Sequence, residues 1–221
     1  MTDIQEYSEN AAIHIRSALE NASLDPHPYP HWSIENVLPD YICKSLLKWD
    51  PGSEAISGDI KGRREYHNQY RVFVDKQKQD EDMGCAALAQ AFEAKETRDV
   101  FTRLTGASLD NTWLRLELYL DKEGFWLEPH TDIGAKKLTF LLSLSTAPGS
   151  EEWGTDIMTP DGKSLGRSLG KFNSAFLFIP SNDTWHGYQR RPMKGIRRTL
   201  ILNYVDDTWR AKQELAFPPS P

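Results

Sequence analysis

The sequence predicts an α+β fold in which helices come first and an antiparallel β-sandwich or barrel follows, with the helices packed on one outer face. Apolar residues recur at helical spacing in much of residues 1–106, whereas residues 107–206 contain several short runs of strand-like sequence. The segments between those runs are rich in Gly, Pro, Ser and Asp, which is typical of turns between antiparallel strands.

The composition predicts one folded domain. The chain has 221 residues, of which 39% are hydrophobic and 11% aromatic, so it can bury a sizeable core. We expect a single domain over residues 1–221, with residues 1–106 as mainly helical support with edge strands and residues 107–206 as the β-rich core that carries the site. The formal net charge of -6 disfavours a general nucleic-acid binder, which would present a basic surface.

The two cysteines, Cys43 and Cys85, lie far apart and in no metal-like spacing. One disulfide between them and two free thiols in a reducing compartment are both open, and free thiols are the simpler reading. The N-terminal sequence MTDIQEYSEN has neither a basic nor an apolar signal-peptide region, and no apolar run approaches the length of a membrane span. We therefore expect a cytoplasmic protein that does not enter a membrane.

Helices and edge strands are expected in the first half. Residues 8–22 place apolar side chains at helical spacing, with Ser8 as the expected cap. A strand is expected over residues 31–39, and Pro39 then opens a short amphipathic helix. The longest helix is expected over residues 81–106, ending at Gly106.

Between these helices the sequence predicts a loop and a strand. Residues 51–64 are rich in Gly and Ser and are expected to form a mobile loop. Aromatic and β-branched residues then predict a strand over Arg64 to Asp75. The loop is also basic, which makes it either a solvated loop or a lid that recruits an anionic group.

The segment TWLRLELYL, residues 112–120, alternates strictly. Its leucines share one face, and the opposite face carries Trp113, Arg115, Glu117 and Tyr119. Two readings are open for this second face: a row exposed to solvent, or the wall of a ligand pocket. Further strands are expected over residues 137–145, 174–180 and 197–205.

A His-x-Asp pair, His130 and Asp132, directly precedes one of these strands, and His186 follows another. Alone the pair is a weak signal, because a chance match is common and a polar turn explains it equally well. Two imidazoles and one carboxylate that converge on one side of a metal form a facial triad, which leaves neighbouring positions open for substrate-side ligands. Iron(II) suits this nitrogen and oxygen set, whereas structural zinc sites are usually closed and tetrahedral.

Two arginines open the strand after His186. Arg197 and Thr199 share one face of it, and an arginine followed by a hydroxyl on the same face suits a carboxylate, which the guanidinium binds bidentately. Arg198 lies on the opposite face and remains the alternative. An exposed arginine at a strand end, without a specific partner, is also open.

The order His-x-Asp, His, Arg-x-Thr in this strand context resembles the iron(II)- and 2-oxoglutarate-dependent dioxygenases, on the prolyl-4-hydroxylase-like branch, over about residues 114–204. The resemblance implies a double-stranded β-helix, the jelly-roll or cupin-like barrel. It also implies three cofactors and co-substrates: Fe(II), 2-oxoglutarate and O2. Residue by residue, it implies iron ligands at His130, Asp132 and His186, and co-substrate contacts at Arg197, Thr199, Tyr119 and Thr139. The segment EEWGTDI resembles the family's glycine-containing strand, but Gly154-Thr155 replaces the usual Gly-Gly pair.

The resemblance implies hydroxylation of an unactivated C–H bond with release of succinate and CO2, or a related desaturation or demethylation. Halogenating relatives have a small residue in place of the carboxylate, which this chain retains as Asp132. We expect a small polar substrate, contacted by Arg115, Glu117, Arg64 and Trp153, and no nucleic acid. The sequence does not predict the oligomeric state. A cupin-type metalloenzyme without 2-oxoglutarate, a catalytically silent binding module and a nucleic-acid demethylase are the alternatives.

Overall fold

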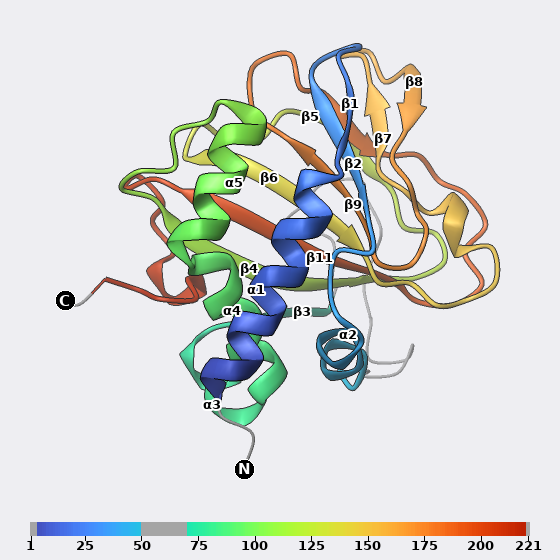
Figure 1. The fold of residues 1–221 in the computed structure, drawn as a ribbon. Coiled ribbons are helices and arrows are strands. Elements are labelled where there is room, and N and C mark those ends of the chain that lie inside the picture. The colour runs from blue at the N-terminus through green and yellow to red at the C-terminus, as the bar shows by residue number, and fades with distance from the viewer. Residues whose placement is uncertain (1–3, 50–69, 220–221) are drawn as a thin grey trace.

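Two antiparallel sheets and a layer of helices make up residues 4–49 and 70–219, the part of the chain that the computed structural model describes (Figure 1). The helices are α1 (Ile4–Glu20), α2 (Asp40–Leu47), α3 (Lys76–Glu81), α4 (Met83–Glu93) and α5 (Lys95–Thr105), with short 3-10 turns η3 (Ser150–Glu152) and η4 (Lys212–Glu214). The strands are β1 (Ser23–Asp25), β2 (His31–Glu35), β3 (Tyr70–Phe73), β4 (Trp113–Asp121), β5 (Leu127–His130), β6 (Lys136–Ser143), β7 (Asp156–Met158), β8 (Ser164–Arg167), β9 (Ser174–Phe178), β10 (His186–Tyr188) and β11 (Arg197–Val205).

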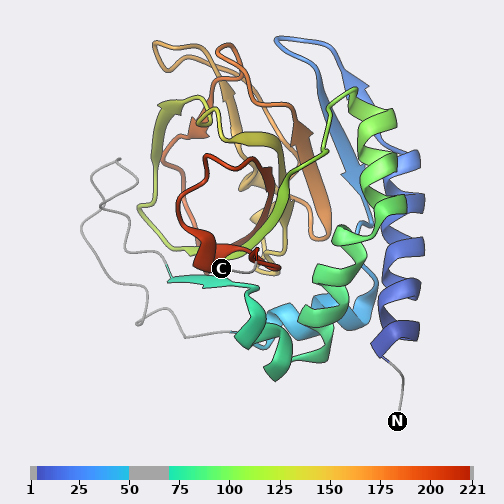
Figure 2. The ribbon, with the colours of Figure 1, turned by 90° about the vertical axis from the view of Figure 1, so that its left-hand side faces the viewer.

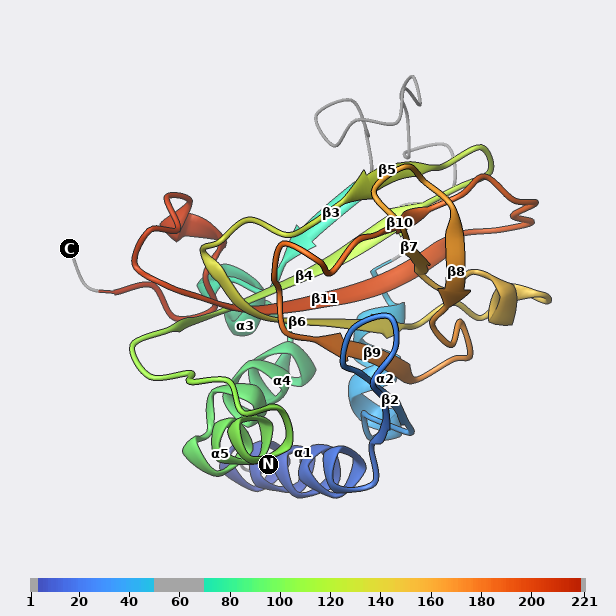
Figure 3. The ribbon, with the colours of Figure 1, turned by 90° about the horizontal axis from the view of Figure 1, so that it is seen from above.

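The sheets form two layers, and the helices form a third. The large sheet has the strand order β1-β2-β9-β6-β11-β4-β3, and the small sheet has the order β5-β10-β7-β8. Helices α1, α4 and α5 lie on one side of the large sheet, and the small sheet lies on the other (Figure 3). The view in Figure 2 shows the blue helix α1 and the green α5 standing together, away from the small sheet. The mixed helical and antiparallel architecture is as predicted.

The apolar side of the large sheet faces the helices because its central strands alternate. The leucine row of β4 (Leu114, Leu116, Leu118 and Leu120) is buried in the main core together with apolar residues of α1, α4 and α5. On β11, Tyr204 belongs to the same face, and its hydroxyl donates to the Phe92 carbonyl of α4 at 2.6 Å. The predicted alternation of residues 112–120 is thus confirmed, and it turns the polar row of β4 away from the helices.

The single helix predicted over residues 81–106 is wrong, because the segment forms two helices. Ala94 has an extended ψ of 132°, so it ends α4 and begins α5. The two helices bury different amounts of their surface: α4 is buried nearly all round, whereas α5 buries only one stripe. No Gly or Pro marks the break. The predicted end at Gly106 is confirmed, since this residue adopts the left-handed conformation with φ 75°.

Of three further expectations, one is wrong, one falls partly outside the described residues, and one stays a prediction. Ser8 does not cap the first helix: α1 begins at Ile4, and the Ser8 hydroxyl, inside the helix, donates to the Ile4 carbonyl. The strand expected over Arg64 to Asp75 is described only as β3, and the basic loop, including Arg64, lies outside the described residues. The described strands form two separate sheets with no closed barrel detected among them, so the jelly-roll topology stays a prediction.

Most strands of the small sheet are not among the elements that the sequence predicts. Its strands have three or four residues each and lie in stretches that read as turns. Such short strands carry too few alternations to show a period of two, and antiparallel partners distant in sequence stabilise them. None of the helices in the described ranges is long and apolar enough to cross a membrane.

The packing between β6 and the helices makes a stability prediction. Phe140 is fully buried, and its ring centroid lies 6.0 Å from that of Phe92 and 5.9 Å from that of Phe101. We expect Phe140→Ala to lower the free energy of unfolding by about 3–5 kcal/mol, because it removes aromatic contacts and leaves a cavity. Urea denaturation measures the loss. Phe172→Ala is the matched control, since Phe172 is 37% exposed; equal losses from the two substitutions would contradict the packing described.

Candidate functional site

A cavity of about 340 Å³ lies between the two sheets. The large sheet contributes side chains from β4, β6 and β11, and the small sheet contributes β5 and β10. The polar row of β4 therefore lines a pocket rather than facing solvent: Arg115 is 2% exposed and Glu117 is 3% exposed. This decides between the two readings that the sequence left open.

The predicted triad comes together at this cavity. His130 ends β5 and pairs in antiparallel register with His186, which begins β10. Asp132 follows two residues after His130, at the turn that leads into β6. Each of the three residues offers one ligand atom, and these atoms all lie within 4.8 Å of one another. Pairing of two short strands thus brings together residues 56 positions apart in the chain.

Backbone carbonyls fix the two imidazoles. The His130 Nδ1 lies 2.9 Å from the carbonyl oxygen of Glu128, and the His186 Nδ1 lies 2.9 Å from that of Thr184. A carbonyl oxygen only accepts, so Nδ1 is the donor in both rings, and in the neutral ring Nε2 is the nitrogen with the lone pair. This orientation, in which the second nitrogen of the ring is bound by a neighbouring acceptor, is the usual one for metal-ligating histidines.

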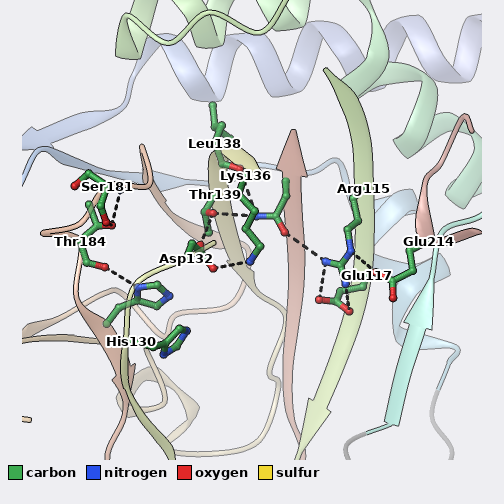
Figure 4. A network of polar contacts seen from close by, with 12 residues as sticks. Arg115, Glu117, His130, Asp132, Lys136, Leu138, Thr139, Ser181, Thr184 and Glu214 are labelled. Carbon is green, nitrogen blue, oxygen red and sulfur yellow. Dashed lines mark hydrogen bonds and ion pairs between the residues drawn. The ribbon is translucent and has the colours of Figure 1, made fainter. Parts of the chain in front are cut away.

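Neighbouring side chains hold the carboxylate of Asp132 in place (Figure 4). The Lys136 Nζ donates to Asp132 Oδ1 at 2.6 Å, and the Thr139 hydroxyl donates to Oδ2 at 2.6 Å. Asn203 Nδ2 in turn donates to the Thr139 oxygen at 2.9 Å. A carboxylate offers about four lone-pair directions, so donors on both oxygens do not by themselves prevent Asp132 from binding a cation.

The donor set fits a divalent metal. Two imidazole nitrogens and one carboxylate oxygen within 4.8 Å are a 2-His-1-carboxylate arrangement, which is typical of non-haem iron(II). Neither cysteine belongs to this cluster, and both are buried thiols elsewhere. His130, Asp132 and His186 are therefore the described residues that could hold iron.

Arg197 points into the cavity, as the alternation on β11 predicts. Its Nη1 donates to Asp121 at 2.6 Å, and its Nε donates to the Trp153 carbonyl at 2.8 Å. Thr199 and Tyr119 also line the cavity, whereas Arg198 does not. This placement favours Arg197 over Arg198 as an anion clamp, and Thr199 and Tyr119 lie on the face where the co-substrate was predicted.

Burial dominates the electrostatics of Asp121. It raises the pKa of the carboxyl to about 6, although the guanidinium of Arg197 acts in the opposite direction. Burial would also raise the pKa of Glu117, but Arg115 and Arg71 outweigh it and hold that pKa below its ordinary value. Both carboxylates are thus tied to arginines inside the pocket, and Glu117 is the more firmly ionised of the two.

A cluster of alternating charges forms another part of the wall. Arg115 binds Glu117 at 2.8 Å and Glu214 at 2.7 Å, and it also donates to Asn203. Arg71 binds the same Glu117 at 2.7 Å from β3, with 41% of its side chain exposed. The rings of Phe73 and Trp209 lie 5.3 and 5.0 Å from the Arg115 guanidinium carbon. Arg115 is therefore largely satisfied by protein groups, and Arg71 is the more accessible cation.

Of the predicted substrate residues, one lies away from the cavity and one falls outside the described residues. Trp153 packs with Phe125, Tyr188 and Met193 and does not line the cavity; its carbonyl, not its ring, contacts Arg197. Arg64 lies outside the described residues. Thr139 does line the cavity, but its hydroxyl is bonded to Asp132, so its predicted contact with a co-substrate stays a prediction.

Several residues of the site were missed in the sequence. Lys136 follows Asp132 by four positions, a spacing that could have been noticed. Asn203 shares the strand face of Arg197, and Asp121 continues the alternation of Arg115, Glu117 and Tyr119, but their partners are set by long-range strand pairing. Glu214 gave no local signal, because the C-terminal segment brings it to the site. The lining of the cavity, through Glu214, also extends beyond the predicted core of residues 107–206.

Comparison with solved structures identifies the fold. A Pseudomonas putida prolyl-4-hydroxylase matches with a TM-score of 0.56 and 12% identity, covering 88% of this chain and 98% of that one. The chain has the fold of the prolyl hydroxylases. A Trichoplax adhaerens prolyl hydroxylase, solved with a hypoxia inducible factor peptide, matches with a TM-score of 0.54 and 14% identity over 92% of each chain.

A third solved structure with this fold has a different activity. The α-ketoglutarate-dependent epimerase SnoN from nogalamycin biosynthesis matches with a TM-score of 0.50 and 15% identity, over 98% of this chain and 97% of that one. No protein-family model matches the sequence, and no curated protein matches it either. The fold is therefore shared among proteins of different activity, so function has to be argued from the site.

The bond from Thr139 makes a prediction about metal affinity. We expect Thr139→Val to weaken binding of Mn(II) or Co(II) by about 10- to 100-fold, because Asp132 loses a donor that orients it. Calorimetric titration of the metal-free protein measures the affinity. Thr199→Val is the matched control, since Thr199 lines the same cavity without a bond to Asp132. Equal affinities in the two variants would show that Thr139 does not orient the ligand.

Proposed function

We propose that this protein is an iron(II)- and 2-oxoglutarate-dependent oxygenase that hydroxylates a C–H bond of a small polar substrate. The convergence of His130, Asp132 and His186 within 4.8 Å carries the proposal. The cavity that holds them also contains Arg197, a buried cation suited to an anionic co-substrate. The fold, shared with prolyl hydroxylases and with an α-ketoglutarate-dependent epimerase, supports it.

Each part of the pocket has a task in this proposal. Bound iron and 2-oxoglutarate supply the oxygen activation, in which the co-substrate is oxidised to succinate and CO2 and one oxygen atom enters the substrate. Arg197 binds the far carboxylate of 2-oxoglutarate, with Thr199 and Tyr119 beside it. Apolar side chains that line the same cavity, Phe125, Leu127, Leu141 and Ile201, keep water away from the reacting groups.

The substrate is proposed to bind beside the charged cluster of Arg71, Arg115, Glu117 and Glu214. These four residues line the cavity together with Trp209, so a polar molecule would meet both charges and an aromatic ring. Arg115 and Glu117 are bonded mainly to each other and to protein partners, which makes them a rigid wall. Arg71 and Glu214 are the more accessible members and are proposed to contact the substrate.

The type of oxidation is the less constrained part of the proposal. Asp132 leaves no space at the carboxylate position for a halide ligand, so hydroxylation is favoured over halogenation. Desaturation and demethylation need the same site and remain the alternatives within the class. A cupin-type metalloenzyme that works without 2-oxoglutarate is the alternative outside it, and a protein that binds the metal but not 2-oxoglutarate would be of that kind.

The chain is further proposed to act as one cytoplasmic domain. The metal ligands come from the β-rich half, and the helices of the first half cover the opposite face of the large sheet. Cys43 and Cys85 are both buried free thiols, which suits a reducing compartment.

A spectroscopic titration tests the proposed cofactors without a substrate. We expect addition of iron(II) and then 2-oxoglutarate to the anaerobic protein to give a visible metal-to-ligand charge-transfer band. The band should be absent in Asp132→Ala. In Arg197→Ala it should require at least about 10-fold more 2-oxoglutarate, because the buried cation is lost. Arg198→Ala is the matched control and should titrate like the unmodified protein, since Arg198 does not line the cavity. Iron binding without a band would contradict the 2-oxoglutarate assignment.

A second prediction concerns the substrate end of the pocket. Once a panel of small polar molecules has yielded one that stimulates succinate release, we expect Arg71→Gln to lower kcat/KM for it by about 10-fold or more. The same variant should largely keep its affinity for 2-oxoglutarate, because Arg71 bonds to Glu117, whereas the co-substrate carboxylate is proposed to bind Arg197. Arg167→Gln, on the edge strand β8, serves as the control. An unchanged kcat/KM in Arg71→Gln would place the substrate elsewhere.

A further inference from the structure

The arginine proposed to bind 2-oxoglutarate already has a resident carboxylate. Arg197, at the start of β11, pairs in register with Asp121, at the end of β4. The Arg197 Nη1 donates to Asp121 Oδ2 at 2.6 Å, Nε donates to the Trp153 carbonyl, and Nη2 donates to the Thr155 hydroxyl at 3.4 Å. A guanidinium has five N–H groups. One N–H on each terminal nitrogen therefore remains without a partner among the described residues, which is the pair needed for a bidentate carboxylate.

Asp121 is poorly compensated for a buried anion. Its side chain is fully buried, and Oδ1 has no hydrogen-bond partner among the described residues. Within residues 4–49 and 70–219, Arg197 is the one charged group that offsets its burial. Burial raises the pKa of this carboxyl to about 6 even with Arg197 beside it. Arg197 is thus the described cation that stabilises the ionised form.

The other charged and titratable groups near Arg197 and Asp121 do not take the place of Arg197 as the partner of Asp121. From β10, the Tyr188 ring lies 4.7 Å from the Arg197 guanidinium carbon, and its hydroxyl interacts electrostatically with Arg197, Arg191, Asp121 and Asp156. Arg191 is itself committed to Asp156 and to the carbonyls of Glu152 and Gly154. No described lysine or second arginine bonds to Asp121.

A second carboxylate at Arg197 would leave one cation between two anions in a buried site. Like charges at short distance in a low-dielectric environment raise each other's pKa, and one of the two takes up a proton. The co-substrate carboxylate receives the two free N–H groups of Arg197, whereas Asp121 keeps one bond and has one empty oxygen. Asp121 is therefore the group that becomes protonated.

We propose that Asp121 is the resident counter-ion of Arg197 and that it takes up one proton from solvent when the far carboxylate of 2-oxoglutarate binds. The inference rests on the proposed function, because it requires 2-oxoglutarate at Arg197. Asp121 is then a positioning residue that also neutralises the arginine while the co-substrate is absent. Its consequence is that co-substrate affinity depends on pH.

The sign of the dependence follows from linkage. The complex holds up to one more proton than the free protein between the pKa of Asp121 in the free protein, about 6, and the higher pKa of Asp121 in the complex. The dissociation constant for 2-oxoglutarate therefore rises with pH above that value, by up to about 10-fold per pH unit. Below it Asp121 is protonated in both states, and this dependence disappears.

The experiment titrates the anaerobic iron(II)-loaded protein with 2-oxoglutarate at several values between about pH 6.5 and pH 8.5. The charge-transfer band gives the dissociation constant, and calorimetry in buffers of different ionisation enthalpy counts the protons taken up. We expect the dissociation constant to rise by at least about 10-fold over this range, with uptake approaching one proton per 2-oxoglutarate at its alkaline end.

Two variants separate Asp121 from other sources of pH dependence. Asp121→Asn keeps an acceptor for Arg197 but carries no charge, so its dissociation constant should be nearly independent of pH. At the alkaline end it should bind 2-oxoglutarate more tightly than the unmodified protein. Asp156→Asn is the matched control: Asp156 is also a buried aspartate paired with arginine, but it does not touch Arg197. It should keep the full dependence on pH.

The outcomes are distinguishable. Binding of 2-oxoglutarate without pH dependence or proton uptake would overturn the role of Asp121 and leave the proposed function intact. The same would follow if the dependence persisted in Asp121→Asn. No binding at any pH would overturn both. If Asp121→Asn fails to fold, the pH dependence and the proton uptake of the unmodified protein and of Asp156→Asn still test the proposal.

Discussion

The alternation of side chains along β4, β6 and β11 is the constraint on which the rest of the structure depends. These adjacent strands put their apolar residues against the helices and their polar residues into the cavity. A shift of register by one residue would bury Arg115 and Glu117 under the helices and turn leucines toward the metal ligands. The cost of that exchange fixes the register, and the register in turn aligns Thr139, Asn203 and Arg115 across three strands.

The cavity buries charge in pairs, which is informative about why the charges are there. Three buried cations are each bonded to a buried carboxylate: Arg115 to Glu117, Lys136 to Asp132, and Arg197 to Asp121. Such pairs contribute little to stability compared with apolar packing, because desolvation offsets their attraction. Three of them around one cavity are therefore better explained by a ligand that needs fixed charges than by folding. The three pairs together carry no net charge. Binding of an anion or a metal ion therefore changes how many protons the groups at the site hold.

The cluster of His130, Asp132 and His186 could be predicted from the sequence because its pattern is local, with His130 and Asp132 two residues apart and His186 after a strong strand. The leucine row of β4 was equally plain. The helix break at Ala94 could not be predicted, since it follows from how two segments pack rather than from a breaking residue. The pairing of Asp121 with Arg197 was also hidden, because 76 positions separate them and only the register of β4 against β11 joins them.

The two kinds of candidate metal ligand are held by different means, and this bears on how the site tolerates change. Each imidazole is oriented by a main-chain carbonyl two residues earlier, so almost any side chain at Glu128 or Thr184 preserves the bond. Asp132 is oriented by side chains, through Lys136 and Thr139. The histidine geometry is therefore a property of the strands, whereas the carboxylate geometry depends on particular residues. Substitutions near the carboxylate are the ones through which the chemistry of this site can be retuned without altering the fold.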